Sequence, residues 1–396
     1  MKNQRIAFST LIVVLILIVG CRQNTVIQSA GLHKLEYNNP GLLVDLDVGF
    51  KSIPMPMDFD GDGDYDLLIS ESGAYVEAGI FYFENISGNV DMPVFRRGMK
   101  VSFERRRLGA DGNSFEVSEV DGQIHVLTPD RANEKLLIYK NVPQNVFWDD
   151  NEIVLPEKAF EYLHFFKSTQ WKMIDFDGDG ISDLIAAVAS QRIPGLRAAG
   201  SVERKKAFEQ APKHKQLIFL RNKGTNNHPV YEDPVEIIKE NGESLALGLS
   251  IKPMFADYDS DGDLDFIGIG RSQSDDNFDV VWKNNFILYF ENTGTKAKYK
   301  FKDGKVLTHN KLPVQMESRS TIHPTAIDWN KDGHIDIIAG EESGRISFLK
   351  NTGEIINGVP QFLPPRFLQQ EAKYVDFGAL VAPRVFDWDG DGLDDI

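Results

Sequence analysis

The 396-residue sequence predicts an all-β fold made of repeated four-stranded units, and three observations support this. An acidic nine-residue pattern, D-x-[DN]-x-D-G-x-x-D, recurs along the chain, a strand-like apolar segment flanks it on each side, and a third apolar segment ending in asparagine follows. Units of four short strands spaced roughly 45–80 residues apart are typical of the blades of a β-propeller. The acidic pattern occupies Asp58–Asp66, Asp175–Asp183, Asp257–Asp265, Asp328–Asp336 and Asp387–Asp395.

The first strand of each unit is expected directly before the acidic pattern, and the second directly after it. The expected first strands are Ile53–Met57, Trp171–Ile174, Met254–Ala256, Thr325–Ile327 and Arg384–Phe386. Asp183–Val188 and Asp336–Ala339 exemplify the second strands. Proline stands four residues before the acidic pattern in four units, where a strand tolerates its missing N–H donor. These prolines are Pro54, Pro253, Pro324 and Pro383.

The third strand of each unit ends in asparagine, and a turn follows it. The third strands are expected at Ile80–Asn85, Leu217–Asn222, Ile287–Asn292 and Ile346–Asn351. Short extended pieces such as Pro229–Tyr231 and Pro360–Phe362 are predicted as fourth strands. One further unit, from Val120–Leu127 to Leu136–Asn141, keeps this frame without the acidic pattern, so we expect a blade that binds no metal. An additional strand is expected at Leu42–Val48.

The spacing of the units gives five whole blades and the start of a sixth within residues 41–396. The sequence stops at Ile396, inside what should be a strand. A propeller closes on itself to remove its open sheet edges. We therefore expect a C-terminally truncated chain from a protein with seven blades.

The first forty residues have the pattern of an export signal and a tether. Lys2 and Arg5 precede the apolar run Ile6–Val19, which is short for a membrane span. The segment ending at Cys21 resembles the bacterial lipobox, in which cleavage precedes a lipidated cysteine. This resemblance implies a lipoprotein signal peptide at 1–20, a lipidated tether at 21–40 and a protein anchored to a membrane of the bacterial cell envelope. An anchor helix with an unrelated cysteine is the alternative.

The charge of the chain limits its partners. There are 59 acidic and 43 basic side chains, which give a formal net charge of −16. Such a field repels phosphate backbones, so a nucleic-acid partner is not expected. The acidic pattern holds a large share of these carboxylates, and bound cations would neutralise much of this charge.

The acidic pattern supplies the ligands that calcium prefers. Side-chain oxygens at positions 1, 3, 5 and 9, with a backbone carbonyl at position 7, form an oxygen-only cage for a hard cation. Glycine occupies position 6 in all five copies, where the backbone has to turn sharply. An EF-hand or dockerin loop requires an acidic residue at position 12, which is absent, and helical flanks. Acidic turns without metal remain the alternative.

The spacing of these acidic residues, together with the recurrent proline and asparagine, resembles the calcium loops of FG-GAP and VCBS repeats, as in integrin α-subunit propellers. The resemblance covers residues ~46–396 and implies several structural Ca²⁺ sites. The fourth loop has Asn330 in place of one aspartate, so we expect weaker binding there. The implied ligands are Asp58, Asp60, Asp62 and Asp66; Asp175, Asp177, Asp179 and Asp183; Asp257, Asp259, Asp261 and Asp265; Asp328, Asn330, Asp332 and Asp336; and Asp387, Asp389, Asp391 and Asp395.

The topology of a propeller blade separates these loops from the expected ligand-binding face. The acidic loops join strands one and two, whereas the long insertions Ser190–Lys215 and Ser272–Asn285 join strands two and three at the opposite face. The first insertion is basic in an acidic protein, so it predicts an acidic polysaccharide or a cell-surface protein as the partner. An ordinary solvated loop is the alternative. The predicted ligand-binding residues are Arg192, Arg197, Arg204, Lys205 and Lys206.

Two functions remain open from the sequence. One is a non-enzymatic surface protein that binds glycans or protein partners. The other is a polysaccharide lyase or glycosidase acting on glycans that contain uronic acid, because the chain is broadly similar to seven-bladed propeller lyases and related glycosidases. That similarity implies histidine or tyrosine as acid–base and a cation beside the substrate carboxylate. The candidates are Tyr162, His164, His323 and Arg271, and no diagnostic catalytic motif accompanies them.

Overall fold

The structure is a computed structural model, and all secondary-structure elements among the residues it describes are strands. The predicted signal peptide and tether, with Cys21, lie outside those residues. Among the residues that the structure describes, no helix is long and apolar enough to cross a membrane. The described residues are 41–49, 51–71, 79–101, 115–130, 135–143, 150–159, 169–188, 216–243, 245, 252, 254–271, 285–295, 298–316, 322–372, 384–387 and 390–392.

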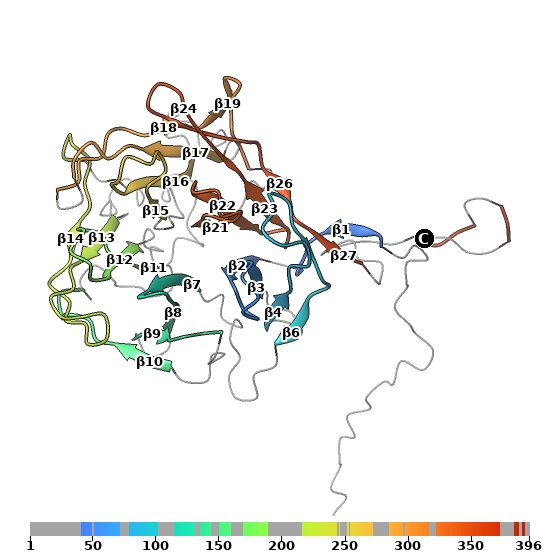
Figure 1. The fold of residues 1–396 in the computed structure, drawn as a ribbon, viewed down its shortest axis with the longest axis horizontal. Coiled ribbons are helices and arrows are strands. Elements are labelled where there is room, and N and C mark those ends of the chain that lie inside the picture. Colours follow the sequence, from blue (N-terminus) through green and yellow to red (C-terminus); the bar gives the residue numbers. More distant parts are fainter. Residues whose placement is uncertain are drawn as a thin grey trace, which may run out of the picture.

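Twenty strands form five four-stranded antiparallel sheets, which are the blades (Figure 1). Blade 1 contains β2 (Ser52–Met57), β3 (Asp66–Glu71), β4 (Gly79–Phe83) and β6 (Met99–Val101). Blade 2 contains β7 (Glu116–Val120), β8 (Gln123–Asp130), β9 (Lys135–Tyr139) and β10 (Asp150–Ile153). Blade 3 contains β11 (Thr169–Ile174), β12 (Asp183–Val188), β13 (Gln216–Leu220) and β14 (Val235–Glu236). Blade 4 contains β15 (Met254–Ala256), β16 (Asp265–Arg271), β17 (Asn285–Phe290) and β18 (Lys305–Val306). Blade 5 contains β21 (Ile322–Ile327), β22 (Asp336–Glu341), β23 (Ile346–Leu349) and β26 (Arg366–Phe367).

The five blades form a closed ring, and this differs from the seven blades that the sequence predicts. There are five apolar cores, and each one lies between two neighbouring blades. The fifth core joins Leu67 and Ile69 of blade 1 to Ile338 and Phe348 of blade 5, and β2 contacts β21 and β22. The number of blades depends on the angle that side chains impose between adjacent sheets, which the spacing of a repeat does not reveal. The seven-blade prediction assumed that the ring was incomplete and left a sheet edge open. The ring formed by the described residues has no such open edge.

A small three-stranded sheet links the two sides of this closure. Strand β27 (Gln369–Glu371), after blade 5, pairs antiparallel with β1 (Leu43–Asp45), before blade 1, and parallel with β5 (Val94–Phe95). The Leu46 N–H also donates to the Leu368 carbonyl at 2.7 Å. Segments from opposite ends of the sequence therefore hold the first and last blades together, and β1 confirms the additional strand expected near residue 42.

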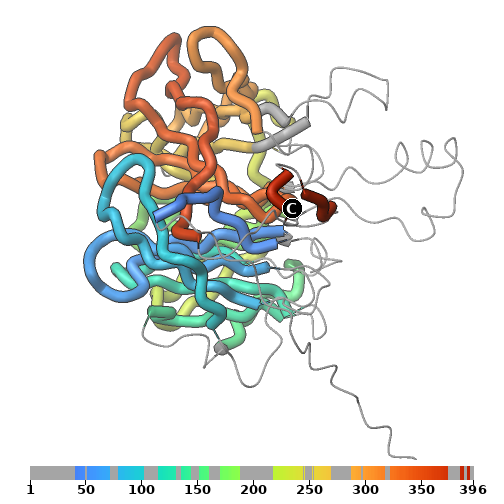
Figure 2. Tube along the Cα trace, turned by 90° about the vertical axis from the view of Figure 1, so that its right-hand side faces the viewer, coloured from blue at the N-terminus to red at the C-terminus, as the bar shows by residue number. Residues whose placement is uncertain are grey.

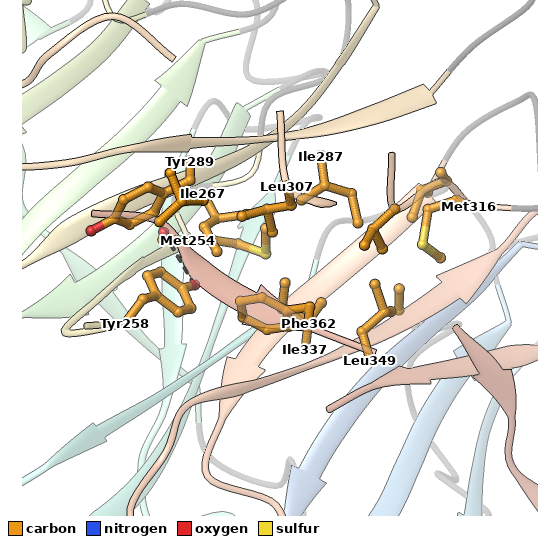
Figure 3. Close-up of a cluster of buried hydrophobic side chains, with 14 residues drawn as sticks. Met254, Tyr258, Ile267, Ile287, Tyr289, Leu307, Met316, Ile337, Leu349 and Phe362 are labelled. Carbon is orange, nitrogen blue, oxygen red and sulfur yellow. Dashed lines mark hydrogen bonds between the residues drawn. The ribbon is translucent and has the colours of Figure 1, made fainter. Parts of the chain in front are cut away.

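The core between blades 4 and 5 shows how neighbouring blades pack (Figure 3). Met254 and Ile267 of blade 4 face Ile337 of blade 5, with Phe362 beside them. The buried hydroxyl of Tyr258 donates to the Met254 carbonyl at 3.5 Å, which satisfies a polar group inside this core. Burying an apolar side chain of this size contributes about 1.5–3 kcal/mol. The side view shows the blue tube of blade 1 between the orange tube of blade 5 and the green tube of blade 2 (Figure 2).

The first three strands of blades 1, 3, 4 and 5 confirm the sequence prediction, whereas the predicted fourth strands are wrong. The first strand predicted at Arg384–Phe386 is also wrong, because only an isolated bridge at Phe386 is found there. Tyr231 makes only an isolated bridge with Asn222, and the fourth strand of blade 3 is β14, a few residues later. Pro360–Phe362 is β25, which pairs with β24 (Asn351–Ile355) outside the blade. A similar hairpin joins β19 (Thr308–His309) to β20 (Leu312–Pro313). The chain makes a wide turn after each asparagine, so pairing with the sheet resumes later than composition suggests.

Blade 2 confirms the blade that was expected to lack an acidic loop. Its first two strands are joined by Asp121 and Gly122, whose φ angles of 53° and 72° are both positive. Two consecutive residues with positive φ define the tight turn favoured between antiparallel strands. The frame of the repeat therefore survives when the acidic loop is replaced by a two-residue turn.

Candidate metal centres

The five acidic loops share the same turn at their sixth residue. In each loop the first aspartate accepts a hydrogen bond from the N–H of the sixth residue, a glycine, at 2.9–3.1 Å. The φ angles of these glycines lie between 85° and 99°, a region that other residues avoid. The sharp turn predicted at position 6 is thus confirmed. The glycines are Gly63, Gly180, Gly262, Gly333 and Gly392.

Three of the loops gather carboxylates closely enough to hold one cation. In each, the oxygens of three aspartates lie within 4.8 Å of one another: Asp58, Asp60 and Asp62; Asp175, Asp177 and Asp183; Asp257, Asp259 and Asp265. The fourth loop carries Asn330 at its third position. In the fifth loop the structure describes Asp387 and Asp391, whereas Asp389 and Asp395 lie outside the described residues. Oxygen-only sets fit Ca²⁺ better than metals that prefer nitrogen or sulfur.

The aspartate at the ninth position is buried and anchors the loop to the blade. One oxygen of Asp66, Asp183, Asp265 and Asp336 accepts the N–H of the strand-three asparagine at 2.8–2.9 Å. The other oxygen accepts the N–H of the second loop residue at 3.1–3.2 Å in three loops. Each carboxylate oxygen has two lone pairs, so this network leaves capacity for a cation. The ninth position therefore combines a fold contact with a possible metal ligand.

Burial of these aspartates disfavours their charged form. Burial is the main cause that raises the pKa of Asp183 to about 7, of Asp265 to about 8 and of Asp336 to about 7. Neighbouring loop carboxylates raise these pKa values further, and the backbone hydrogen bonds partly oppose the shift. A bound divalent cation would reverse this shift because it favours the ionised carboxylate.

The strand-three asparagine clamps the acidic loop to the following turn, a role that the sequence analysis missed. The Asn85 amide nitrogen donates to the Tyr65 carbonyl in the loop at 3.2 Å, and its side-chain oxygen accepts the Ser87 N–H at 3.0 Å. The equivalent bonds recur at Asn222, Asn292 and Asn351. The recurrence of asparagine was visible in the sequence, and its joint occurrence with the acidic loop was the available signal.

Blade 2 has no acidic loop, yet it keeps a bond equivalent to the one between the ninth-position aspartate and the asparagine N–H. There the N–H of Asn141 is directed at Nδ1 of His125 at 3.3 Å. His125 thus takes the place that an aspartate oxygen occupies in the other blades. The histidine therefore keeps the bond to the asparagine N–H in a blade without an acidic loop.

The acidic loops of blades 1, 3, 4 and 5 fall into two classes. The classes differ in the residues of the third strand of the same blade, which lies beside the loop. In blades 1 and 4 a tyrosine stands three residues before the asparagine, and glutamate stands directly before it. The Tyr289 hydroxyl lies 3.0 Å from both Asp259 and Asp265, and Tyr82 contacts Asp60 and Asp66 at 3.4 and 3.2 Å. These two loops contain no basic side chain among the described contacts of their carboxylates.

Blades 3 and 5 instead place a basic side chain beside the loop. Arg221 Nε lies 2.5 Å from Asp177, and its Nη2 lies 3.2 Å from Asp179. Lys350 Nζ lies 3.4 Å from Asp332 and 2.5 Å from Asp91. Phenylalanine replaces the tyrosine in both blades. We therefore expect these two loops to bind calcium more weakly, because a protein cation already offsets their charge.

Replacing Arg221 with alanine is expected to strengthen calcium binding in blade 3. The change removes a competing cation from two loop carboxylates, and we expect a gain in calcium affinity on the order of tenfold. Calorimetric titration of the calcium-stripped protein measures it. Arg96→Ala is the matched control, because Arg96 pairs with Glu84 at 2.8 Å rather than with a loop aspartate. Equal or weaker calcium binding in Arg221→Ala would contradict the competition.

The strand pairings place the acidic loops at one face of the ring and the ends of the second strands at the other. In blade 1, Met57 pairs with Asp66 beside the loop, and Ser52 pairs with Glu71 at the far end. Blades 3 and 5 follow the same pattern. The separation of the two faces that the sequence predicts is thereby confirmed for the described strand ends.

The remaining candidates have different outcomes. Tyr162, His164 and the basic residues of the first insertion lie outside the described residues. Arg271 ends β16 at the face opposite the acidic loops, and its side chain is not described. His323 lies on β21, and its ring nitrogens are buried. The structure therefore does not bring these catalytic candidates together into one described site.

The ring of four-stranded antiparallel blades defines the class of this chain as a β-propeller. Residues 328–396 match the family described as FG-GAP-like repeat, so the predicted repeat family is confirmed in that part of the chain. This segment begins at the acidic loop of blade 5 and contains the first aspartate of the fifth loop. No curated protein matches the chain.

Three solved structures illustrate what the chain is similar to. A mutant of the GH43 protein BlXynB from Bacillus licheniformis shares 13% identity over 85% of this chain, with a TM-score of 0.44, and this chain spans 60% of that protein. The GH43_1 enzyme from Xanthomonas citri shares 12% identity over 81% of this chain and 93% of that enzyme, with a TM-score of 0.44. AofleA from Arthrobotrys oligospora shares 9% identity over 85% and 93%, with a TM-score of 0.35. At these TM-scores the propeller assignment rests on the ring of sheets itself.

Proposed function

We propose that this chain is a calcium-stabilised, exported propeller that displays a ligand-binding face. The observation that supports it most is the recurrence of one loop geometry, in which three aspartates approach within 4.8 Å around a glycine turn. Carboxylates at this separation repel one another unless a cation or protons intervene. Ca²⁺ in these loops would stabilise the connection between the first two strands of its blade.

The calcium sites of this proposal are structural rather than catalytic. Their aspartates bind backbone N–H groups of their own loop and of the strand-three asparagine, which holds them in the frame of the blade. The same geometry recurs in blades that differ in their other residues. A repeated site of this kind serves the scaffold, and the ligand then belongs at the opposite face, where the second strands end.

The proposed ligand is an acidic polysaccharide or a cell-surface protein. Support comes from the positive charge of the insertion between Ser190 and Lys215 in a chain of net charge −16. A basic segment on an acidic protein attracts polyanions to that segment, while the rest of the protein repels them. The lipobox-like segment ending at Cys21 supports display of this propeller at the cell envelope, tethered through residues 21–40.

Reversing the charge of the insertion is expected to abolish binding of an acidic polysaccharide. In the triple variant Arg204→Glu, Lys205→Glu, Lys206→Glu, the changed side chains repel the polyanion, and we expect a loss of at least about 100-fold. Titration with polygalacturonate in the presence of calcium measures it. The control is the triple variant Lys298→Glu, Lys300→Glu, Lys302→Glu. It makes the same charge change at exposed sites in the segment that follows the third strand of blade 4. Undiminished affinity in the insertion variant removes this ligand assignment.

The same titration separates binding from catalysis. A lyase would release unsaturated uronate, which absorbs in the ultraviolet, whereas a binding protein would leave the polymer intact. Release of that product by the wild-type chain would support the enzymatic alternative that the sequence leaves open.

A further inference from the structure

A small cavity lies between the innermost strands of the propeller. The first strand of each blade faces the centre of the ring: β2, β7, β11, β15 and β21 (Figure 1). The cavity has a volume of about 60 Å³, and side chains of blades 2 to 5 line it. A water molecule needs roughly 10–15 Å³ by this measure, so the space suffices for a group of several heavy atoms.

Three charged side chains line this cavity, together with apolar residues such as Met254, Phe255 and Ile335. Glu116, Lys172 and Lys252 line it from three different blades. Lys252 pairs with Glu116, and both side chains are buried, at 5% and 7% exposed. Lys172 has no carboxylate partner among the described residues and donates to the Val117 carbonyl at 2.6 Å. Burial lowers the pKa of Lys172, and the charges of Glu116 and Glu119 partly oppose this shift, so an anion beside Lys172 would favour its charged form.

His323 adds unsatisfied hydrogen-bonding groups beside the cavity. It precedes Pro324 and Thr325, which line the cavity, and neither of its buried ring nitrogens has a hydrogen-bond partner among the residues that the structure describes. Burial, followed by the charges of Lys252 and Lys51, lowers the pKa of His323 well below its usual range. The imidazole is therefore neutral near pH 7, with one N–H donor to offer. Buried polar groups are seldom left unpaired in native proteins, so the missing partner needs an explanation.

We propose that this axial cavity binds a small oxyanion, a carboxylate or an inorganic oxyanion such as sulfate. Lys172 supplies an ammonium group that an anion would keep charged, Lys252 adds its remaining N–H donors, and the neutral ring of His323, which is close enough to feel the charge of Lys252, adds one N–H donor. An anion would satisfy these groups together, since ion pairs that are also hydrogen-bonded are the stable arrangement for buried charge. The residues come from blades 3, 4 and 5, so a bound anion would also connect the blades around the axis.

The cavity extends to the acidic loop of blade 5, whose Ile335 lines it, but the groups proposed to bind the anion lie elsewhere. Lys252 precedes β15 and His323 lies near the start of β21, whereas the loops lie at the other ends of these strands. A free inorganic anion and the carboxylate of a uronic acid share the chemistry that this cavity recognises. Only the second would connect the cavity to the polysaccharide ligand proposed above.

Thermal unfolding in different sodium salts tests the site. With calcium saturating and sodium constant, replacing chloride with sulfate or glucuronate is expected to raise the unfolding midpoint of the wild-type chain by a few degrees, saturably. Lys172→Met, which keeps the length of the side chain without its charge, is expected to lose the saturable part and keep the general effect of sulfate. Lys135→Met is the control, since Lys135 forms an ion pair with Glu152 on the exposed edge of blade 2. A saturable rise that persists in Lys172→Met overturns the proposal.

A second measurement decides the matter if Lys172→Met does not fold. Nitrogen NMR of the wild-type histidine rings, with His323 assigned by its loss in His323→Gln, is expected to show the His323 signals shifting on titration with the same salts. The shift should saturate at the concentration that saturates the midpoint. Unshifted His323 signals overturn the proposal. Saturation by glucuronate but not sulfate indicates a uronic acid, and the reverse indicates an inorganic anion.

Discussion

Removing calcium from the purified chain is expected to lower the midpoint of thermal unfolding by on the order of 10 °C. Without a cation, the loops of blades 1, 3 and 4 each hold three carboxylates with oxygens within 4.8 Å of one another. Their mutual repulsion acts in the folded protein and is relieved by unfolding, whereas bound calcium stabilises only the folded loop. Differential scanning calorimetry with excess calcium, and after chelation and gel filtration, measures the difference.

Restoration with other cations gives this experiment its control. Calcium is expected to restore the midpoint, and magnesium at the same concentration to restore much less, because Mg²⁺ requires shorter bonds and near-octahedral geometry. Asp257→Ala removes one ligand from the loop of blade 4 and should reduce the calcium-dependent part of the midpoint. Its counterpart Asp303→Ala removes an exposed acid that pairs with Lys239. Equal midpoints with and without calcium would contradict a stabilising role for the loops.

The sequence predicted the elements of the fold better than their closure. The acidic pattern, the strand that precedes it and the asparagine-terminated strand recur in the same order, so blades 1, 3, 4 and 5 could be placed along the chain. The number of blades could not be predicted, because it depends on packing between sheets. Ile69 and Phe348 meet across the closure, and nothing local in either segment indicates that contact.

The candidate sites divide in the same way. The conformation of the acidic loops was predictable because all the residues that determine it lie within nine positions, from Asp58 to Asp66 for example. The pairing of Arg221 with Asp177 joins the residue after β13 to the acidic loop before β12, and it became visible only through the register of blade 3. The charged residues of the axial cavity are still further apart in the sequence, since Glu116 and Lys252 come from different blades. Long-range contacts of this kind leave no periodic signal in a sequence.

Raising the pH is expected to destabilise the calcium-free chain, the opposite of what carboxylates involved in ion pairs would produce. Burial raises the pKa of Asp183 to about 7, of Asp265 to about 8 and of Asp336 to about 7, from a usual value of 3.8. A raised pKa in the folded state means stability that is present below the unfolded pKa and lost as the pH rises through the folded value. The loss therefore falls between about pH 4 and pH 8.

The size of this effect follows from the same linkage. One pKa unit corresponds to about 1.4 kcal/mol, so even partial ionisation of three such groups removes several kcal/mol from a fold whose stability is typically about 5–15 kcal/mol. We expect the unfolding midpoint of the calcium-free chain to fall steadily from pH 5 to pH 8.5. With calcium bound, these aspartates are ionised in the folded state, so the midpoint should not fall over that range.

A single substitution assigns the pH dependence to the loops. Asp265→Asn keeps an oxygen that can accept the Asn292 N–H, now donated at 2.9 Å, and removes the titrating group with the highest of these pKa values. The calcium-free variant is therefore expected to lose less stability between pH 5 and pH 8.5 than the wild-type chain, and to bind calcium more weakly in blade 4. Asp303→Asn, at an exposed site, should leave the wild-type curve unchanged. A wild-type midpoint that rises with pH in the absence of calcium would show that the ninth-position aspartates are ionised without a cation.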